Sequence, residues 1–478
     1  MNQPNETMLI DFYEFTMAHG YFEKGLQDQM VYFDLFFRKI PDNAGYAIMA
    51  GLESIVHYIE NMTFSKEDID YLRARGVFSE AFLEYLADFR FTGDLYSVKE
   101  GTAIFPGEPI MTVRANAVEA QLVETYLLLA VNHQSLIATK ASRIKDVAKE
   151  RKVIEMGARR AHGPSSANLG ARAAYIGGAD STSNTYADRV FSIPSGGTMA
   201  HSWIQMFDDE YEAFKAYAEL YPDMSIFLVD TYDTLRTGVP NAIKVIKETL
   251  EPKGYKNCAI RIDSGDLTYL SKQARKMLDD AGLEHCKIVA SNALDEYLIR
   301  ALLNQGAPID VFGVGERLIT SKSDPVFGGV YKLTGIEKNG SVIPKIKISD
   351  NPAKITNPHF KKLYRIYDKK TDHACADLLT VYNETIDESK PLTLFDPTHT
   401  WQRQTFTDYY VKNLLIPIFK GGSRVYDLPP LKDVKKHAQA ELKSLWEEVK
   451  RFDYPHQYYV DLSEKLWKVK YNLINRYK

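Results

Sequence analysis

Short apolar runs recur between residues 150 and 315 and alternate with segments of helical character. The apolar runs are residues 153–155, 226–229, 259–262, 287–290 and 309–314. Helix-like spacers occupy 241–250, 268–281 and 294–304. Strands that alternate with helices pair in parallel, because each helix carries the chain back to the same end of the sheet. This pattern predicts an α/β fold with a parallel sheet, either a closed barrel or a doubly wound sheet.

The residues that follow the expected strands favour the barrel. Polar groups come after one strand after another, in the order Arg159-Arg160, Asp230, Asp263 with Asp266, Ser291-Asn292 and Glu316. A barrel assembles its site from the carboxyl ends of many successive strands, whereas a doubly wound sheet gathers it at one switch point. We therefore expect an irregular TIM-like (β/α) barrel.

The length of the chain indicates more than one domain. A chain of 478 residues is longer than a single hydrophobic core usually supports. Helix and strand signals mix in residues 1–130, which predicts an N-terminal α+β domain with helical hairpins at 65–89 that have Ser and Lys-Glu starts. Residues 336–348 have the pattern of a β-hairpin around Asn339-Gly340. We expect the barrel domain at 131–345, and a C-terminal β/helical region at 346–478 that packs on the N-terminal domain. Within that region, 387–400 has a Pro-rich, loop-like sequence, and 432–478 is expected to be helical with an interruption at Pro455.

Composition excludes several classes of function. The net charge of −4 is nearly balanced, so nothing favours a nucleic-acid or membrane surface. No apolar run reaches membrane-spanning length, and the N-terminal residues lack the pattern of an export signal. The three cysteines form no CxxC pair and no metal-site spacing. We expect a cytoplasmic protein.

A Gly-rich segment at 194–203 is the first candidate site. Backbone N–H groups at paired glycines approach an anion closely, and Gly197 is followed by the hydroxyl donor of Thr198. His201 lies four residues past Gly197 and can carry a proton or a phosphoryl group near neutral pH. The alternative is a structural cap or a core histidine.

Two expected strand ends carry charged groups. Alternation along a strand puts Arg261 and Asp263 on the same face. The guanidinium can stack on a planar ring or fork a carboxylate, and the aspartate can hold a sugar or a metal-bound phosphate. The alternative is a structural Arg–Asp pair. Asp230 ends the preceding strand, where an aspartate is equally often the N-cap of the next helix.

A second Gly-rich turn follows the last expected strand. Gly313-Val314-Gly315 resembles a phosphate-binding turn, in which backbone N–H groups bind the anion. Leu318 stands where a dinucleotide fingerprint has its third glycine, so a dinucleotide fold is poorly supported. Glu316 would repel a phosphate unless a cation or Arg317 intervenes.

Two further segments carry unusual side chains. Arg159 and Arg160 are adjacent at a strand end and are costly to bury unpaired, which indicates an anionic ligand or a surface ion pair. Tyr13 lies in an aromatic N-terminal segment whose simplest interpretation is core packing. Walker A, GxSxG, HExxH and protein-kinase motifs are absent from the sequence.

Together these motifs resemble the nicotinate phosphoribosyltransferase family, which has the type II phosphoribosyltransferase fold. The resemblance covers nearly the whole chain, in segments 11–17, 155–163, 177–184, 197–203, 228–238, 261–267, 290–296 and 313–315. It implies transfer of a phosphoribosyl group from phosphoribosyl pyrophosphate to nicotinate, giving nicotinate mononucleotide and pyrophosphate for NAD synthesis. It also implies that ATP is hydrolysed alongside to ADP and phosphate, and that the protein is a homodimer.

The same resemblance implies roles for individual residues. His201 would be the phosphohistidine that couples ATP, and it would be catalytic together with Asp230 and Asp263. The implied substrate-binding residues are Tyr13, which would reach the neighbouring subunit's site, and Arg159, Gly197, Thr198, Arg261, Gly313, Gly315 and Glu316. Mg²⁺ would accompany phosphoribosyl pyrophosphate, with protein ligands that the sequence does not identify.

Two departures from the family pattern stand out. Glu316 occupies a place where many relatives have a small hydroxyl residue, which puts a phosphate contact by this side chain in doubt. Residues 357–362 read Asn-Pro-His-Phe-Lys-Lys where relatives often have a Pro-Gly turn before a Lys-rich segment.

Other enzymes remain possible from sequence. Nicotinamide phosphoribosyltransferase shares the fold and the histidine, although Arg159 and Arg261 favour a ring that bears a carboxylate. A sugar-phosphate lyase or aldolase on a barrel would need a Schiff-base lysine or a full metal-ligand set at a strand end, and the sequence shows neither. A non-catalytic metabolite-binding relative is disfavoured by the presence of His201, Asp230 and Asp263.

Overall fold

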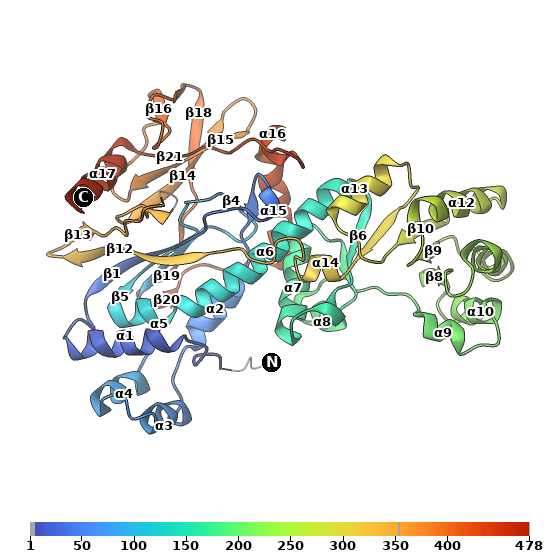
Figure 1. Ribbon diagram of the computed structural model, residues 1–478, viewed down its shortest axis with the longest axis horizontal. Helices are drawn as coiled ribbons and strands as arrows, with labels where there is room; N and C mark the ends of the chain where they lie inside the picture. The colour runs from blue at the N-terminus through green and yellow to red at the C-terminus, as the bar shows by residue number, and fades with distance from the viewer. Residues whose placement is uncertain (1–4, 352–353, 478) are drawn as a thin grey trace. The chain divides into compact units, whose positions relative to one another are not determined.

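The computed structural model describes residues 5–351 and 354–477 and divides the chain into two compact units (Figure 1). Unit 1 combines Met1–Leu136 with Val326–Lys478, and unit 2 is Ile137–Pro325. The two ends of the chain are thus grouped in one unit. The expected division into three domains stays a prediction.

Unit 2 is built on a parallel sheet, which confirms the expected α/β class. Its strand order is β7 (Ser181–Thr182), β6 (Lys152–Glu155), β11 (Val311–Val314), β10 (Lys287–Ala290), β9 (Cys258–Ile262) and β8 (Ser225–Leu228). Every neighbouring pair in this order is parallel. The sequence pattern missed β7, which has two residues. Among the described residues no ladder joins the edge strands β7 and β8, so the strands form an open sheet.

Helices connect these strands (Figure 1), and α11, α12 and α13 lie at the three predicted spacers. They are α7 (Pro164–Ile176), α8 (Thr185–Phe191), α9 (His201–Gln205), α10 (Glu210–Leu220), η4 (Thr234–Gly238), α11 (Val239–Val245), α12 (Leu267–Asp280), α13 (Glu296–Asn304) and α14 (Glu316–Ile319). Aspartates cap the N-termini of α12 and α13. Asp266 accepts a hydrogen bond from the N–H of Tyr269 at 3.0 Å, and Asp295 accepts one from Leu298 at 2.8 Å. These caps satisfy N–H groups that the first helical turn leaves unpaired.

Unit 1 contains a seven-stranded sheet. Its order is β13 (Ser341–Pro344), β12 (Val330–Lys338), β1 (Met30–Phe36), β5 (Met111–Asn116), β3 (Asp94–Ser97), β19 (Ile416–Lys420) and β20 (Ser423–Arg424). The expected hairpin between β12 and β13 is confirmed, with Asn339 and Gly340 at φ 51° and 74°. Positive φ at both central residues gives the twist that a two-residue hairpin loop needs.

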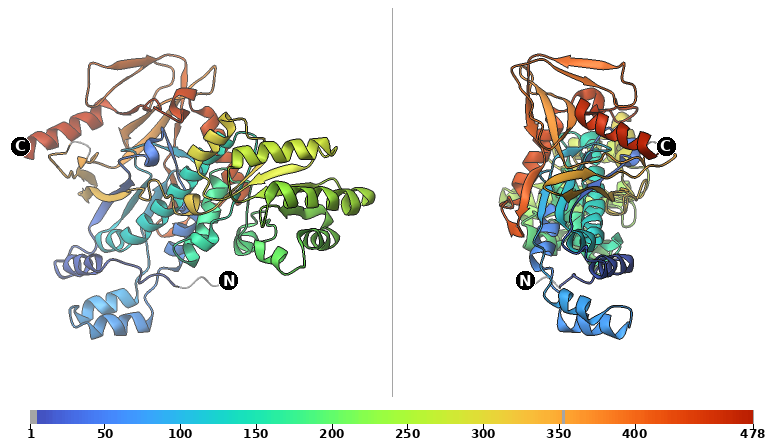
Figure 2. Two further views of the ribbon diagram at one scale, coloured as in Figure 1. Left: turned by 45° about the vertical axis from the view of Figure 1, so that its right-hand side comes forward. Right: turned by 90° about the vertical axis from the view of Figure 1, so that its left-hand side faces the viewer.

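Helices of unit 1 pack on this sheet and beside it. They are α1 (Phe12–Glu23), α2 (Leu52–Asn61), α3 (Lys66–Ala74), α4 (Glu80–Ala87), α5 (Ala117–Leu122), the long α6 (Glu124–Ala148), whose end belongs to unit 2, and α15 (Leu431–Ser444), α16 (Glu447–Lys450) and α17 (Glu464–Tyr477). Helices α3 and α4 lie side by side as a helical hairpin (Figure 2). Their N-caps Ser65 and Ser79 confirm the serine starts that the sequence indicates.

The late part of unit 1 has more strand than the sequence predicts. A four-stranded sheet has the order β18 (Tyr409–Asn413), β14 (Lys361–Asp368), β15 (Ala374–Val381) and β21 (Val460–Leu462), and a hairpin pairs β16 (Leu392–Phe395) with β17 (Arg403–Phe406). The expected loop at 387–400 was therefore wrong at β16, and the expected helical segment was wrong at β21. Strand β16 is a four-residue arm of a hairpin, and β21 has three residues and pairs with β15, which is distant in sequence. Local propensity is a weak guide to strands this short.

Buried ion pairs join the late segments of unit 1 to the early ones. Arg365 on β14 is fully buried and donates to Asp377 at 2.8 and 2.7 Å and to Glu441 at 2.7 Å. It also donates to the carbonyl of Ala103 in β4 (Ala103–Ile104) at 2.8 Å. Breaking a buried pair by removing one partner costs about 3–5 kcal/mol. This network therefore holds β14, β15, α15 and β4 in one arrangement.

None of the helices in the described ranges is long and apolar enough to cross a membrane.

The stability of unit 1 is expected to depend on pH through Asp461. This residue is 8% exposed in β21, where burial, with a smaller contribution from Asp396, raises its pKa to about 7. The unfolded carboxyl has a pKa near 3.9, so the folded state binds more protons between these values. Stability contributed by the protonated form is therefore present below about pH 4 and is lost as pH rises to about 7, by roughly 2–4 kcal/mol.

Asp461→Asn, which keeps a neutral side chain at all pH values, should reduce this loss. We expect the variant to have a higher thermal unfolding midpoint than the wild type at pH 8 and a similar one near pH 4, by scanning calorimetry. Asp427→Asn, at an exposed aspartate, serves as the control. Parallel pH profiles for wild type and Asp461→Asn would contradict the prediction.

Candidate functional site

Carboxylates and hydroxyls meet at the carboxyl ends of β8, β9 and β10. These strands are parallel neighbours in register, so the residues that follow them emerge at one edge of the sheet. Asp230 Oδ2 accepts hydrogen bonds from the N–H of Asp263 at 2.9 Å and from the hydroxyl of Ser264 at 2.6 Å. Asp263 Oδ1 in turn accepts a hydrogen bond from the Ser291 hydroxyl at 2.5 Å. These contacts link three strand ends into one polar cluster.

One carboxylate oxygen of Asp230 accepts no hydrogen bond within this cluster. This oxygen, Oδ1, is buried and has no hydrogen-bond partner among the described residues. The helical cap that follows β8 is Asp233, which accepts from the N–H groups of Leu235 and Arg236 at 3.2 and 2.9 Å. The interpretation of Asp230 as an N-cap is therefore wrong. A buried carboxylate oxygen without a partner is costly, which indicates that a ligand completes it.

Arg261 on β9 supplies a partly buried positive charge beside these acids. Burial lowers the pKa of its guanidinium, whereas the charges of Asp263 and Asp230 raise it and that of Arg159 lowers it. Its Nε is buried without a hydrogen-bond partner in the described part of the chain. Since the two carboxylates leave this donor unmatched, the guanidinium is available to an anionic or planar ligand.

Arg159 lies in the exposed turn η2 (Ala158–Arg160) that follows β6. The fully buried Glu155 holds this turn in place. One of its oxygens accepts a hydrogen bond from the N–H of Gly157, and the other accepts the Thr182 hydroxyl at 2.7 Å. A Cβ at Gly157 would lie 2.5 Å from Ile319 Cβ, so the turn needs glycine. The position of Arg159 is thus set by the packing of β6, β7 and α14.

The Gly-rich segment spans the space between the two edge strands. The N–H of Thr182 in β7 donates to Pro194 O at 3.1 Å, and Gly196 N–H donates back to Thr182 O at 3.0 Å. On the other side, the Thr198 hydroxyl donates to Ile226 O in β8 at 2.6 Å. The Thr198 hydroxyl proton is therefore engaged with the backbone here. Gly197 between them is exposed.

His201 lies near the end of the Gly-rich segment and is the first residue of α9. Its Nδ1 lies 3.1 Å from the hydroxyl of Thr231, the residue after Asp230. The imidazole is half-buried, and the structure records no partner for its Nε2 in the described ranges. The contact brings His201 to the carboxyl end of β8, beside the acidic cluster.

The turn after β11 lies against the same edge. A Cβ on Gly313 would be 2.7 Å from Met156 Sδ and 3.4 Å from Ser291 Cβ, so this position admits no larger residue without displacement. Gly315 precedes α14 and has no side chain to cover its N–H. Glu316 Oε1 forms an ion pair with Lys322 Nζ at 2.7 Å, which lowers its pKa. Lys322 is therefore a cation that offsets the negative charge of Glu316.

Tyr13 belongs to unit 1, and the structure does not place it relative to the cluster of unit 2. It lies on α1 and is 45% exposed. Burial and the neighbouring Glu124 raise the pKa of its hydroxyl. The tyrosine is therefore a neutral donor with half of its surface free, rather than a core residue.

Sequence reasoning gave no role to three members of the cluster, the hydroxyl residues Thr231, Ser264 and Ser291, although Ser291 was recognised as a polar residue at a strand end. Thr231 and Ser264 directly follow Asp230 and Asp263, and Ser291 directly follows β10, so their positions after a strand could have identified them. Hydroxyl residues are common in turns for other reasons, which made that signal weak. In the described ranges no group of three or more His, Cys, Asp or Glu side chains is arranged to hold a metal ion by itself.

Comparison with known proteins gives one consistent answer. Models of the nicotinate phosphoribosyltransferase (NAPRTase) N-terminal domain, the NAPRTase family and the nicotinate phosphoribosyltransferase C-terminal domain match residues 8–132, 151–385 and 360–470. The nicotinate phosphoribosyltransferase of Bacillus subtilis (strain 168) is 48% identical over 468 residues, which cover 98% of this chain and 95% of that protein.

More distant relatives agree. Nicotinate phosphoribosyltransferase pncB2 of Mycobacterium tuberculosis (strain ATCC 25618 / H37Rv) is 39% identical and covers 96% of this chain and 92% of its own. The crystal structure of human nicotinic acid phosphoribosyltransferase superposes with a TM-score of 0.84 at 29% identity, covering 97% of this chain and 99% of that one.

The close approach of η4 to β8 generates a prediction for unit 2. A Cβ on Gly238 would lie 1.9 Å from the carbonyl oxygen of Val229, directly before Asp230. Gly238→Ala should cost about 1–3 kcal/mol and lower the thermal midpoint of unit 2 by roughly 2–12 °C. Gly196→Ala is the matched control, since a Cβ there meets nothing within 4 Å. Equal midpoints for the two variants in scanning fluorimetry would contradict the packing argument.

Proposed function

Because this chain belongs to the nicotinate phosphoribosyltransferase family, we propose that the strand-end cluster of unit 2 is where nicotinate meets phosphoribosyl pyrophosphate. The protein is an enzyme of NAD biosynthesis that transfers phosphoribosyl to nicotinate and so forms nicotinate mononucleotide. One observation carries the proposed site: the cluster contains both a buried donor, Arg261 Nε, and a buried acceptor, Asp230 Oδ1, that have no hydrogen-bond partner among the described residues.

Arg261 recognises nicotinate in this proposal. A guanidinium whose Nε is free can bind the pyridine carboxylate or stack on the ring. Arg159 adds positive charge to the same pocket, and Thr198 lines it with a hydroxyl oxygen that can still accept a hydrogen bond. Tyr13, which is half exposed on α1, contributes from the neighbouring subunit of a homodimer.

The chemistry asks little of the protein beyond position and charge. The pyridine nitrogen has a free lone pair and needs no general base, so the reaction depends on alignment with the anomeric carbon. As the bond to pyrophosphate breaks, positive charge develops on the sugar. The carboxylates of Asp230 and Asp263 stabilise this charge, and their hydrogen bonds to Ser264 and Ser291 fix them before the substrate arrives.

Mg²⁺ fits the same acids. Proteins often hold it with one or two carboxylates plus substrate phosphates and water, so a complete protein cage is not required. The unpartnered Asp230 Oδ1 and the neighbouring Asp263 are the residues that would bind it. When bound, the ion neutralises charge on the pyrophosphate leaving group.

The turn after β11 binds the phosphate end of the substrate. Gly313 and Gly315 let the backbone approach closely, and Gly315 N–H and its neighbours at the start of α14 can donate to an anion. Glu316 does not contact phosphate itself. Its ion pair with Lys322 offsets its negative charge, so that the phosphate can bind nearby.

ATP acts through His201. Phosphorylation at the free Nε2 would add negative charge and acceptor oxygens to the segment that contains Gly197 and Thr198. The hydrogen bond between Nδ1 and Thr231 orients the ring and connects that segment to the end of β8. A phosphohistidine there can therefore reorder the substrate pocket.

The Gly-rich segment also supports an irregular barrel. It hydrogen-bonds to β7 at one end and to β8 at the other, and so completes the ring that the open sheet begins. The proposed location is the cytoplasm, in keeping with three cysteines that are free.

The first test measures substrate choice. Incubation with phosphoribosyl pyrophosphate, Mg²⁺ and either pyridine should yield nicotinate mononucleotide far faster than nicotinamide mononucleotide, with stimulation by ATP. Arg261→Gln should raise the KM for nicotinate about tenfold or more, because a charged contact to the carboxylate is lost. Lys322→Gln, outside the nicotinate pocket, should leave that KM unchanged. Faster turnover of nicotinamide by the wild type would overturn the substrate assignment.

The second test concerns the ATP-coupling histidine. ATP labelled at the γ-phosphate should leave an acid-labile, base-stable phosphate on the wild type and none on His201→Asn. Thr231→Val should label more slowly, since its ring loses an orienting hydrogen bond, while its thermal midpoint stays close to that of the wild type. His285→Asn serves as the control at a surface histidine. Full labelling of His201→Asn would remove His201 from this role.

A further inference from the structure

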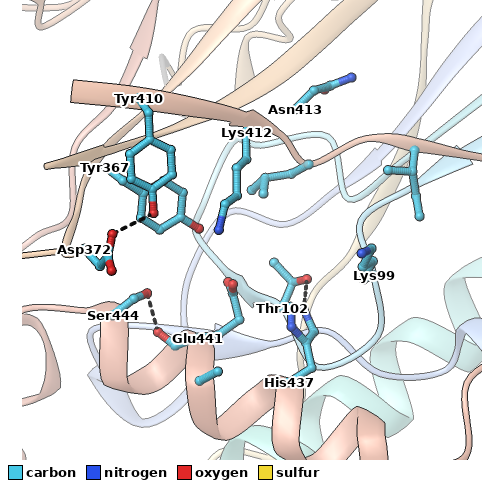
Figure 3. A pocket seen from close by; sticks show the side chains of 13 residues that line it. Lys99, Thr102, Tyr367, Asp372, Tyr410, Lys412, Asn413, His437, Glu441 and Ser444 are labelled. Atoms are coloured by element: carbon cyan, nitrogen blue, oxygen red, sulfur yellow. Dashed lines mark hydrogen bonds between the residues drawn. The ribbon is translucent and has the colours of Figure 1, made fainter. Parts of the chain in front are cut away.

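A pocket in unit 1 lies outside every residue of the proposed catalytic site. Its volume is about 500 Å³, and α15, β14, β18 and the chain between β3 and β4 line it (Figure 3). It is large enough for a mononucleotide. We propose that this pocket binds a nucleoside phosphate, which makes it a second, non-catalytic ligand site of the enzyme.

Two ammonium groups of the pocket lack ion-pair partners. In the described part of the chain, no carboxylate lies within ion-pair distance of Lys99 or Lys412. Lys412 Nζ instead lies 4.6 Å from the ring centre of Tyr367 and 5.5 Å from that of Tyr410. These two rings stack on each other at 5.0 Å, and they support the lysine stem. Figure 3 shows the amino group of Lys412 directed into the pocket.

The two acids of the pocket are already engaged by the protein. Glu441 Oε2 accepts a hydrogen bond from the buried Arg365 at 2.7 Å. Asp372 Oδ1 accepts the hydroxyl of Tyr410 at 3.2 Å. Each acid therefore has one oxygen engaged by the protein and keeps the other as an acceptor. Neither carboxylate lies within ion-pair distance of the exposed Lys99 or Lys412, which favours a ligand with a negative group on the side of the lysines.

The distribution of charge along the pocket narrows the ligand further. Asp372 and Lys99 lie at opposite sides of the view in Figure 3, with Lys412 between them. A phosphate suits the side of the lysines. The hydroxyls of a ribose or an exocyclic amine can donate to the acceptors of Asp372 and Glu441, as carboxylates do in other nucleotide sites. Inorganic phosphate alone would leave this acidic side unused.

His437 adds a neutral group to the floor of the pocket. Burial lowers the pKa of its imidazole, and Lys99, Arg365 and Lys412 lower it further against the opposing charge of Glu441. Its Nε2 lies 3.1 Å from the Thr102 hydroxyl. The imidazole can therefore exchange hydrogen bonds with a ligand near neutral pH without adding a charge of its own.

The test uses 8-azido-AMP as a photoaffinity probe on the full-length protein, followed by cleavage at acidic residues and mass spectrometry. Labelling is expected on the peptide that contains Tyr410 or on the peptides of α15. In Lys99→Gln/Lys412→Gln this labelling should fall roughly tenfold or more, because two charged contacts to the phosphate are lost. The control is Lys443→Gln, at an exposed lysine of α15 that does not line the pocket. This variant should label like the wild type.

Labelled peptides of unit 2 report the catalytic site and are scored separately, so failure here does not bear on the proposed function. Equal labelling of the pocket peptides in the double lysine variant would overturn the proposal, as would their absence from the wild type at saturating probe. Unlabelled AMP should protect these peptides at least tenfold better than inorganic pyrophosphate. Equal protection by pyrophosphate would overturn the nucleoside part of the assignment.

Discussion

The parallel register of β8, β9 and β10 is the constraint on which the proposed site of unit 2 depends. Because these strands end together, the carboxylate of Asp230 can accept the backbone N–H of Asp263, and Asp263 can accept the hydroxyl of Ser291. Antiparallel neighbours would send these residues to opposite edges. The register also leaves Asp230 Oδ1 and Arg261 Nε unmatched and close to a common space, which is what a ligand of mixed charge requires.

Unit 1 uses buried charge differently. Arg365 satisfies Asp377 and Glu441 within the protein, so its network serves to join segments that are far apart in the sequence. The neighbouring pocket depends on this network, because Arg365 holds Glu441 in place on its wall. Lys99 and Lys412 also line the pocket and, in our proposal, bind the negative group of a ligand. The buried Arg365 is thus paired within the protein where it supports the fold, whereas the exposed Lys99 and Lys412 have no ion-pair partner among the described residues at the site where we propose a ligand.

Much of the fold was predictable because its signals are local. The apolar runs of unit 2, the serine caps of α3 and α4, and the Asn339-Gly340 turn each act within a few residues, and each prediction was confirmed. Strands β7, β16 and β21 were missed because they have only two to four residues, too few for a clear alternating pattern, and β21 pairs with β15, which is distant in sequence. The barrel, the roles of the site residues and the dimer remain proposals.

By itself, the sequence determined five of the strands of unit 2, the helices at its three predicted spacers, and which residues follow those strands, because these depend on local periodicity and chain direction. It also carried the family likeness that the comparisons confirmed. Only the tertiary structure decided which strand ends are neighbours. It also decided that the Thr198 hydroxyl donates a hydrogen bond to the backbone of β8, and that Lys322 offsets the negative charge of Glu316. These are contacts between positions whose separation in the chain does not reveal their distance in space, and packing alone selects them.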